Sequence, residues 1–202
     1  MSGIRAAVFD LGGVLLGYDF SRWAAKTAPY CRPGVDLLGM VREYHAEHAA
    51  LTGNIDMAEI QAWLANRAGL QGMSAEDFEL AWCDIFWRMP EMEALVSRLP
   101  IDGRYLLSNT NWAHVDWIEQ RYPDVLALFD RVFLSCELRM AKPDPIIYDY
   151  VQQRTCAAGF ETIFVDDRLD NVAAARAAGW HGIHFQGIEP LRAELAKYLP
   201  LM

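Results

Sequence analysis

The chain has 202 residues, of which 53% are hydrophobic and 22% are charged, a balance typical of a globular protein with one sizeable core. The net charge of −9 argues against a nucleic-acid partner, because binding to phosphate backbones requires clusters of Lys and Arg that this sequence lacks. The longest uncharged run, 177–188, is too short to span a membrane, and the four cysteines form no CxxC pair, so we expect a cytoplasmic protein with free thiols.

The first predicted element is a strand at Ile4–Phe9 that leads directly into Asp10. Both of its faces are apolar, which favours a strand of a parallel sheet that is covered by helices on both sides. Gly12 and Gly13 follow, and glycines leave backbone amides free to approach a ligand. The stretch therefore predicts a buried strand that delivers a carboxylate to an open turn.

Residues 18–89 have helical periodicity and no clear strand. We expect four helices here, at Phe20–Ala28, Leu37–Leu51, Met57–Gly69 and Ala75–Phe86. A helical insertion that follows the first strand of a sheet would lie above the strand ends as a lid.

Strands and helices alternate in the remainder of the chain. The predicted strands are Tyr105–Leu107, Val132–Leu134, Ile163–Val165 and Ile183–Phe185, and the predicted helices are Asn111–Tyr122, Pro145–Ala158 and Asp170–Ala178. This alternation predicts an α/β fold with a Rossmann-like, doubly wound parallel sheet. We expect residues 1–17 and 90–202 to form the core and residues 18–89 to form an inserted helical cap.

Polar side chains follow four of the predicted strands: Asp10, then Ser108 and Asn109, then Lys142, then Asp166 and Asp167. Each has an ordinary explanation alone, as a helix cap, a turn residue or a solvated cation. The adjacent carboxylates are harder to explain, because like charges repel and require a cation or hydrogen-bond donors. Since ligands bind at the carboxyl ends of strands in open α/β sheets, the set predicts one site.

These residue types suit phosphoryl transfer. A carboxylate such as Asp10 can act as a nucleophile and form an aspartyl-phosphate. Attack on a phosphate dianion depends mainly on charge neutralisation, and Mg²⁺ prefers the oxygen ligands that Asp10 and one of the paired aspartates would supply. Lys142 would hold the phosphate oxygens as a point charge, with the Ser108 hydroxyl completing the contacts.

Four segments together resemble the motifs of the haloacid dehalogenase-like hydrolase superfamily: VFDLGGVL, LLSNTN, AKPDPIIY and FVDDRLDNVAAARAAGW. The resemblance spans Ile4 to Phe185, and residues 18–89 fall where that family inserts its C1-type helical cap. SNTNWAH, YPDV and DDRLDN resemble the bacterial alpha-D-glucose-1-phosphate phosphatase type, and the chain is also similar to the phosphatase domain of bifunctional epoxide hydrolases. The resemblance implies a Mg²⁺-dependent phosphatase of small phosphorylated metabolites.

The resemblance also implies a role for each motif residue. Asp10 would be the nucleophile and a metal ligand, Ser108 and Asn109 would bind phosphate, and Lys142 would stabilise it. Asp167 would be the side-chain metal ligand, Asp166 a direct or water-bridged partner, and the Gly12 carbonyl a further ligand. Asn171 falls where many members carry another acid.

Gly12 departs from the family pattern. Most phosphatases of the family have an aspartate at this place, which protonates the leaving oxygen, and such groups contribute ~10²–10⁴-fold to the rate. Asp19, His45 and His48 are candidate replacements. A helix cap explains Asp19 equally well, and a solvated helix face explains His45 and His48 better than a catalytic role does. Our hypothesis is that Gly12 is tolerated because the substrate is activated, as in a sugar 1-phosphate with its acidic anomeric hydroxyl.

Two other functions remain open. A 2-haloacid dehalogenase also uses an Asp nucleophile, a Ser and a Lys, and it too lacks the second acid. It needs no metal, however, so the adjacent carboxylates of Asp166 and Asp167 count against this function. A catalytically silent binding domain on the same fold is the other alternative. Trp82, Trp87, Tyr44, His45 and His48 are candidate lid contacts, and the sequence leaves the oligomeric state undetermined.

Overall fold

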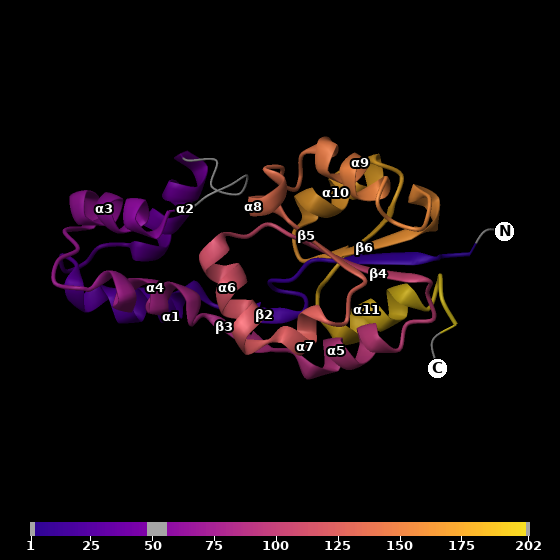
Figure 1. The fold of residues 1–202 in the computed structure, drawn as a ribbon, viewed down its shortest axis with the longest axis horizontal. Coiled ribbons are helices and arrows are strands. Elements are labelled where there is room, and N and C mark those ends of the chain that lie inside the picture. The colour runs from indigo at the N-terminus through magenta and orange to yellow at the C-terminus, as the bar shows by residue number, and fades with distance from the viewer. Residues whose placement is uncertain (1–2, 48–55, 201–202) are drawn as a thin grey trace.

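A computed structural model describes residues 3–47 and 56–200 of the chain. Figure 1 shows a sheet with helices on both faces and, to one side of it, a separate group of helices from the N-terminal half. No helix within the described residues has the length and apolar character needed to cross a membrane.

The central sheet has five parallel strands in the order β5-β4-β1-β6-β7. The strands are β1 (Ala6–Phe9), β4 (Gly103–Ser108), β5 (Arg131–Leu134), β6 (Thr162–Asp166) and β7 (His181–His184). Phe9, the last residue of β1, pairs with Leu106 on one side and with Val165 on the other. The residues that follow these three strands therefore meet at one edge, and the predicted parallel α/β sheet is confirmed.

Side chains of β1 alternate between two apolar layers, as expected for a strand covered on both faces. Phe9 belongs to the layer that includes Leu95 of α5 (Pro90–Ser97) and Leu195 of α11 (Ile188–Leu195). Val8 belongs to the layer that includes Tyr148 of α9 (Pro145–Gln152) and Ala175 of α10 (Leu169–Ala177). Figure 1 shows these helix pairs on opposite faces of the sheet.

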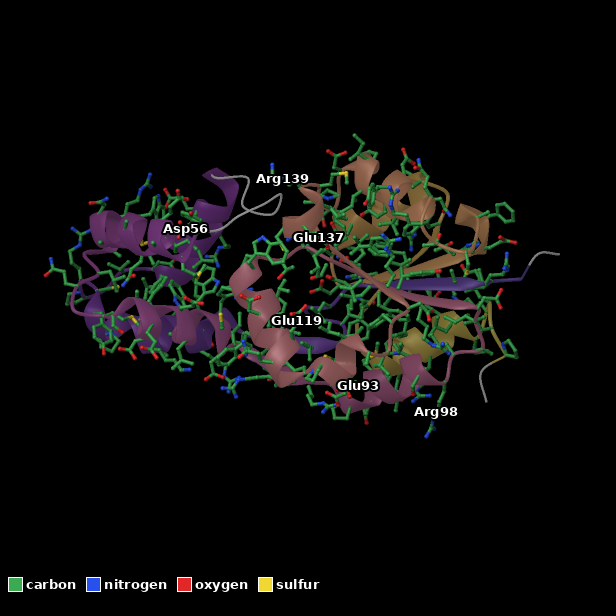
Figure 2. All side chains as sticks on the ribbon, viewed as in Figure 1. Asp56, Glu93, Arg98, Glu119, Glu137 and Arg139 are labelled. Carbon is green, nitrogen blue, oxygen red and sulfur yellow. The ribbon has the colours of Figure 1, made fainter. Side chains whose placement is uncertain are left out.

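The remaining connections of the core are short helices: α6 (Trp112–Arg121), α7 (Pro123–Leu126), α8 (Ser135–Leu138) and the 3₁₀ turn η2 (Gly159–Glu161). Pro123 separates α6 from α7, because proline fits the first turn of a helix but not its interior. Figure 2 shows charged side chains such as Arg98 and Arg139 projecting away from the ribbon, while carbon-rich side chains gather on both faces of the sheet.

The segment between β1 and α5 contains four helices, as predicted. They are α1 (Phe20–Thr27), α2 (Leu37–Glu47), α3 (Met57–Ala68) and α4 (Ala75–Cys83), with the turn η1 (Ala28–Tyr30) after α1. The predicted end of the second helix, Leu51, lies outside the described residues. Trp23 packs edge-on against Trp82, with ring centroids 5.4 Å apart, so a small aromatic core joins α1 to α4.

The prediction that residues 18–89 contain no strand is wrong. β2 (Leu16–Tyr18) pairs antiparallel with β3 (Phe86–Arg88), which begins at Phe86, the last residue of the fourth predicted helix. Three-residue strands are too short for alternation to reveal them, and their pairing joins residues distant in the chain. The predicted boundaries of the cap, residues 18 and 89, fall at this two-stranded β2–β3 sheet. The division into core and cap stays a prediction.

Candidate active site

Asp10 lies directly after β1, at the centre of the sheet edge. Its backbone amide donates to the Val165 carbonyl at 2.9 Å, which continues the strand pairing to this residue. Its Oδ1 accepts a hydrogen bond from the Leu11 amide at 2.7 Å and pairs with Lys142 Nζ at 2.8 Å. Burial raises the pKa of Asp10 to about 6, although Lys142 opposes the shift.

Lys142 is a buried cation with three oxygen acceptors. Its Nζ lies 2.8 Å from Asp10 Oδ1, 2.7 Å from Asp166 Oδ2 and 2.8 Å from the Leu107 carbonyl. An ammonium group has three donors, so these contacts satisfy all of them. Burial lowers the pKa of Lys142, but the carboxylates of Asp10 and Asp166 outweigh burial and raise it above its usual value. The structure thus places a permanent positive charge between two acids.

Asp166, at the end of β6, is fully buried and surrounded by donors. Its Oδ2 accepts one hydrogen bond from Lys142 Nζ at 2.7 Å, and its Oδ1 accepts one from the Arg168 amide at 2.9 Å. The Asn171 amide nitrogen lies 3.0 and 3.1 Å from the two oxygens. The lone pairs of Asp166 are therefore largely occupied by protein donors.

Asp167, by contrast, lines the pocket and is only partly buried. Burial, together with the charge of Asp166, raises the pKa of Asp167. Its backbone carbonyl lies 3.0 Å from the Nε2 atom of His184, and its carboxylate rests against the backbone of Gly13. Gly13 has a φ of +80°, and a Cβ there would collide with the carboxylate, so this position requires glycine for two reasons.

Ser108 is the last residue of β4, Asn109 follows it, and both line the same pocket. Asn109 is fixed to the backbone of Lys142 at both ends of its amide. Its Nδ2 donates to the Lys142 carbonyl at 2.7 Å, and its Oδ1 accepts from the Lys142 amide at 3.0 Å. In this structure Asn109 therefore positions Lys142, a contact that the sequence motif alone did not reveal.

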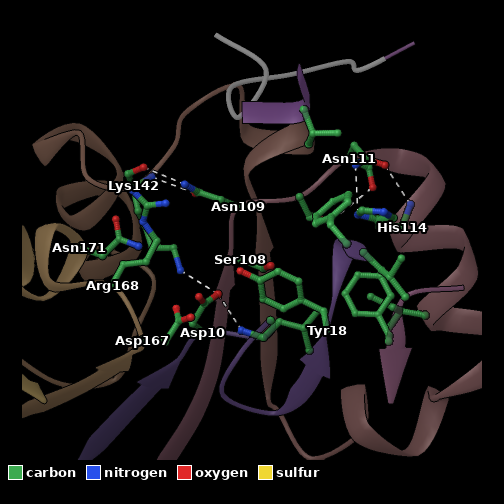
Figure 3. Close-up of a pocket in the computed structure, with 18 of the residues that line it drawn as sticks. Asp10, Tyr18, Ser108, Asn109, Asn111, His114, Lys142, Asp167, Arg168 and Asn171 are labelled. Atoms are coloured by element: carbon green, nitrogen blue, oxygen red, sulfur yellow. Dashed lines mark hydrogen bonds and ion pairs between the residues drawn. The ribbon is translucent and has the colours of Figure 1, made fainter. Parts of the chain in front are cut away.

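Oxygens of Asp10, Asp166 and Asp167 lie within 4.8 Å of one another, close enough to surround one metal ion. Carboxylate oxygens are the ligands that Mg²⁺ prefers, so the residues fit this ion. Three acids opposed by Lys142 leave an excess of negative charge that a divalent cation would balance. The predicted residues of the four motifs therefore converge at one place, as Figure 3 shows for Asp10, Ser108, Asn109, Lys142 and Asp167.

A pocket of about 310 Å³ opens beside these carboxylates. Besides the predicted residues it is lined by side chains that the sequence analysis did not single out: Leu11, Tyr18, Phe20, Val41, Arg42, Ile85, Phe86, Thr110, Asn111, His114, Ile118 and Arg168. Several come from β2, β3, α1, α2 and α6, outside the parallel sheet. No local sequence signal marks them, because only the tertiary arrangement brings these elements over the strand ends.

Tyr18 lies directly beside Gly12. A Cβ at position 12 would be 3.3 Å from two ring carbons of Tyr18, so the ring borders the space that an aspartate side chain would use. Burial, followed by the charges of Asp167 and Asp10, raises the pKa of the Tyr18 hydroxyl. Figure 3 shows Tyr18 and His114 on the side of the pocket opposite Lys142, Asp167 and Asn171.

Of the suggested replacements for the acid at position 12, Asp19 is described by the structure and does not line the pocket. Asp19 is the N-cap of α1, where its carboxylate accepts a hydrogen bond from the Ser21 amide at 2.7 Å. His48 and the side chain of His45 lie outside what the structure describes.

The other suggested lid contacts are also placed elsewhere among the described residues. Trp82 is fully buried in the α1–α4 core, Tyr44 is also buried, and Trp87 is exposed on β3. None of these three is among the residues that line the described pocket. Aromatic residues at helical spacing are in this case mostly core residues.

Comparisons with known proteins agree with this geometry. The model of the haloacid dehalogenase-like hydrolase family matches residues 4–179. A sesquiterpene phosphatase of Aspergillus oryzae is 30% identical, covering 89% of each chain. A D-ribitol-5-phosphate phosphatase of Bacteroides thetaiotaomicron is 26% identical over 97% of this chain and 98% of its own.

A solved structure extends the likeness to the fold and to bound groups. It is a Bacteroides thetaiotaomicron enzyme of the same family in complex with magnesium and inorganic phosphate. This chain superposes on it with a TM-score of 0.75 and 26% sequence identity, and the match covers 90% of this chain and 94% of that chain.

Proposed function

Because the chain belongs to the haloacid dehalogenase-like hydrolase family, we propose that it is a Mg²⁺-dependent phosphatase of small phosphorylated metabolites that acts through an aspartyl-phosphate on Asp10. The observation that carries the proposal is the cluster of Asp10, Asp166 and Asp167, whose oxygens lie within 4.8 Å of one another, with the buried Lys142 paired to Asp10 and Asp166. Such a cluster would bring a nucleophile, its positive partner and a cation site close together. The two phosphatase relatives and the neighbour with magnesium and phosphate support it.

Asp10 is the proposed nucleophile. Since Leu11 and Lys142 hold its Oδ1, we assign the attack on phosphorus to Oδ2. The bond from phosphorus to the alcohol oxygen breaks, its electron pair stays on that oxygen, and the oxygen takes a proton from solvent because Gly12 has no acidic side chain. Water then attacks the phosphorus, which breaks the Asp10–phosphate bond and releases inorganic phosphate.

Asp10, Asp167 and the Gly12 carbonyl are the proposed ligands of Mg²⁺, which would neutralise charge on the phosphate when bound. Asp166 is the proposed partner beside them. Because protein donors occupy the oxygens of Asp166, its contacts favour an indirect role, through Lys142 and through water. Asp167 lines the pocket and is better placed to contact the ion.

Ser108 and Asn109 are proposed to bind the phosphate oxygens at the end of β4. Lys142 contributes its charge at short range, while its three donors stay on Asp10, Asp166 and Leu107. Its main effect would then be to hold Asp10 in place and to reduce the repulsion between this carboxylate and the incoming dianion.

Sugar phosphates such as glucose 1-phosphate are one candidate substrate class, supported by the motif resemblance and by the ribitol-phosphate phosphatase relative. The competing dehalogenase function is disfavoured by the three-carboxylate cluster, which would leave excess negative charge without a cation. A silent binding domain is disfavoured by the intact contacts of Asp10 and Lys142.

One experiment separates these functions. Release of inorganic phosphate from a panel of phosphorylated metabolites is measured with Mg²⁺ and with EDTA, in parallel with chloride release from 2-chloropropionate. We expect phosphate release that EDTA stops and added Mg²⁺ restores. Chloride release that is insensitive to EDTA would instead identify a dehalogenase, and silence in both assays would identify a binding domain.

Gly13→Ala should weaken the response to Mg²⁺. The left-handed backbone at Gly13 costs an alanine about 1–2 kcal/mol, and the new Cβ would displace the Asp167 carboxylate. We expect a lower melting temperature and a several-fold higher Mg²⁺ concentration for half-maximal activity. Gly34→Ala is the matched control, since Gly34 has the same φ of +80° but open space around its Cβ. An equal change in Mg²⁺ response for both variants would refute the placement of Asp167.

Gly12→Asp tests the hypothesis about the leaving group. If an activated substrate compensates for the missing acid, a carboxyl group at position 12 should raise the kcat/KM for ethyl phosphate by ~10-fold or more, and raise that for glucose 1-phosphate much less. Gly12→Asn is the control, because it imposes the same displacement of the Tyr18 ring without an acid. Equal gains for both substrates would contradict the hypothesis.

A further inference from the structure

The side of the pocket that faces away from Lys142 is apolar. Its apolar side chains come from β2 and β3, from the turn directly before β3, and from α1, α2 and α6. They are Tyr18, Phe20, Val41, Ile85, Phe86 and Ile118. The proposed phosphate contacts and metal ligands lie on the opposite side, at the ends of the sheet strands. The pocket therefore combines one charged end with one hydrocarbon-rich end.

Four rings form a continuous surface on this apolar side, which we call the aromatic wall: Tyr18, Phe20, Phe86 and His114. The ring centroids of Tyr18 lie 6.2 Å from Phe20 and 6.4 Å from Phe86, and those of Phe86 and His114 are 5.0 Å apart. Such spacings are typical of packed aromatic pairs. The wall begins beside Gly12, next to the nucleophile, so it borders the position of a leaving group.

The side-chain polar atoms of Asn111 and His114, next to the apolar rings of the aromatic wall, already have partners within the protein. Asn111 Oδ1 accepts from the His114 amide at 3.0 Å, and Asn111 Nδ2 lies 3.2 Å from His114 Nδ1. The other ring nitrogen of His114, Nε2, lies 3.2 Å from the Trp82 carbonyl. A neutral ring that donates from Nε2 satisfies this whole set. A sugar placed here would lose water from its hydroxyl groups and would have to compete for these atoms.

We propose that the pocket takes phosphate monoesters of apolar alcohols, with the hydrocarbon part against the aromatic wall and the phosphate at Asp10. The proposal rests on the proposed phosphatase function and names the substrate class of that same site. The volume of about 310 Å³ accommodates a hydrocarbon chain of several carbons beside the phosphate. Arg42 also lines the pocket, but its side chain is mostly exposed and lies 3.9 Å from Asp36.

The test is a series of primary alkyl phosphates from ethyl to hexyl phosphate. Their leaving groups have nearly equal acidity, so Gly12 affects every member alike and only the apolar contact changes. Burying one methylene group completely strengthens binding about fourfold. Allowing for partial burial, we expect kcat/KM with Mg²⁺ to rise at least ~30-fold from ethyl to hexyl phosphate.

Two esters of similar leaving group serve as polar controls: 6-hydroxyhexyl phosphate and glucose 6-phosphate. Both should be poorer substrates than hexyl phosphate. A flat series, or a preference for glucose 6-phosphate or glucose 1-phosphate over hexyl phosphate, would overturn the inference while leaving the phosphatase function intact. Absence of phosphate release from every ester would overturn the phosphatase function and the inference together.

A substitution in the aromatic wall tests whether the wall causes the rise in kcat/KM with chain length. Phe20→Asn should reduce the rise in kcat/KM from ethyl to hexyl phosphate to a few-fold, whereas Phe20→Leu should retain most of the rise. Phe160→Asn is the control, because Phe160 is 60% exposed and is not among the residues that line the pocket. An unaltered rise in Phe20→Asn would show that the chain does not lie against this wall.

Discussion

Replacing Asp10 by asparagine should abolish phosphate release, with kcat falling at least ~1000-fold. An amide nitrogen or oxygen is a poor nucleophile, and the variant also loses one proposed ligand of Mg²⁺. The measurement is steady-state phosphate release with saturating Mg²⁺, on protein whose folding is verified by its melting curve.

The same variant should be at least as stable as the parent at pH 7. Burial raises the pKa of Asp10 to about 6, so the ionised carboxylate is less favourable in the folded chain than in the unfolded chain. Asparagine removes that cost, as is common when a functional residue is neutralised. Asp19→Asn is the matched control, since asparagine also caps helices and Asp19 caps α1 outside the pocket. Undiminished turnover in Asp10→Asn would refute the choice of nucleophile.

Replacing Lys142 by methionine should reduce both activity and stability. Methionine has a similar length but leaves Asp10 and Asp166 without the positive charge that lies 2.8 and 2.7 Å from them. Removing one partner of a buried ion pair typically costs about 3–5 kcal/mol, which corresponds to a melting temperature roughly 10 °C lower for a chain of this size. We also expect kcat to fall ~100-fold or more. Thermal denaturation and steady-state kinetics measure the two effects.

Lys26→Met is the control for Lys142→Met. Lys26 pairs with Asp84 at 2.6 Å, but both side chains are more than 40% exposed, and exposed pairs contribute only about 0–1 kcal/mol. The melting temperature and kcat of Lys26→Met should therefore stay close to those of the parent. A melting temperature for Lys142→Met that matches the control would contradict the structural role assigned to the buried lysine.

The charged end of the site was predictable because of its strand pattern. Asp10, Ser108 and Asp166 each occupy the last or next position of a buried strand, and parallel strands bring such positions to one edge. Their convergence followed from topology alone. The precise contacts did not follow: nothing in the motif AKPDPIIY indicates that Lys142 uses all its donors on Asp10, Asp166 and Leu107.

The apolar end of the pocket was not predictable from the sequence. Phe86 was expected at the end of a helix, and it instead lies in a three-residue strand whose partner, Tyr18, is far away in the chain. His114 lies in the first turn of α6, next to the cap residue Asn111, and nothing local shows that the distant Trp82 carbonyl contacts its ring. Such residues are positioned by long-range packing, whereas periodicity and motifs report only local structure.

The nature of the leaving group connects the two ends. Gly12 removes the usual acid, and Tyr18 borders the space above it. A pocket that holds the alcohol against the aromatic wall would aid catalysis by positioning the ester over Asp10 and by excluding water from it. The alkyl phosphate series and Gly12→Asp examine these two contributions separately.

The central claim, that Asp10 carries the phosphoryl group during turnover, has a direct test. The enzyme is mixed with Mg²⁺ and a good substrate, quenched with acid in the steady state, treated with borohydride and analysed by peptide mass spectrometry. Borohydride reduces an acyl phosphate, so we predict conversion of Asp10 to homoserine in the peptide that contains Phe9 and Leu11, and no conversion without substrate. Phosphate release with an unmodified Asp10, or conversion at another aspartate, would contradict the account.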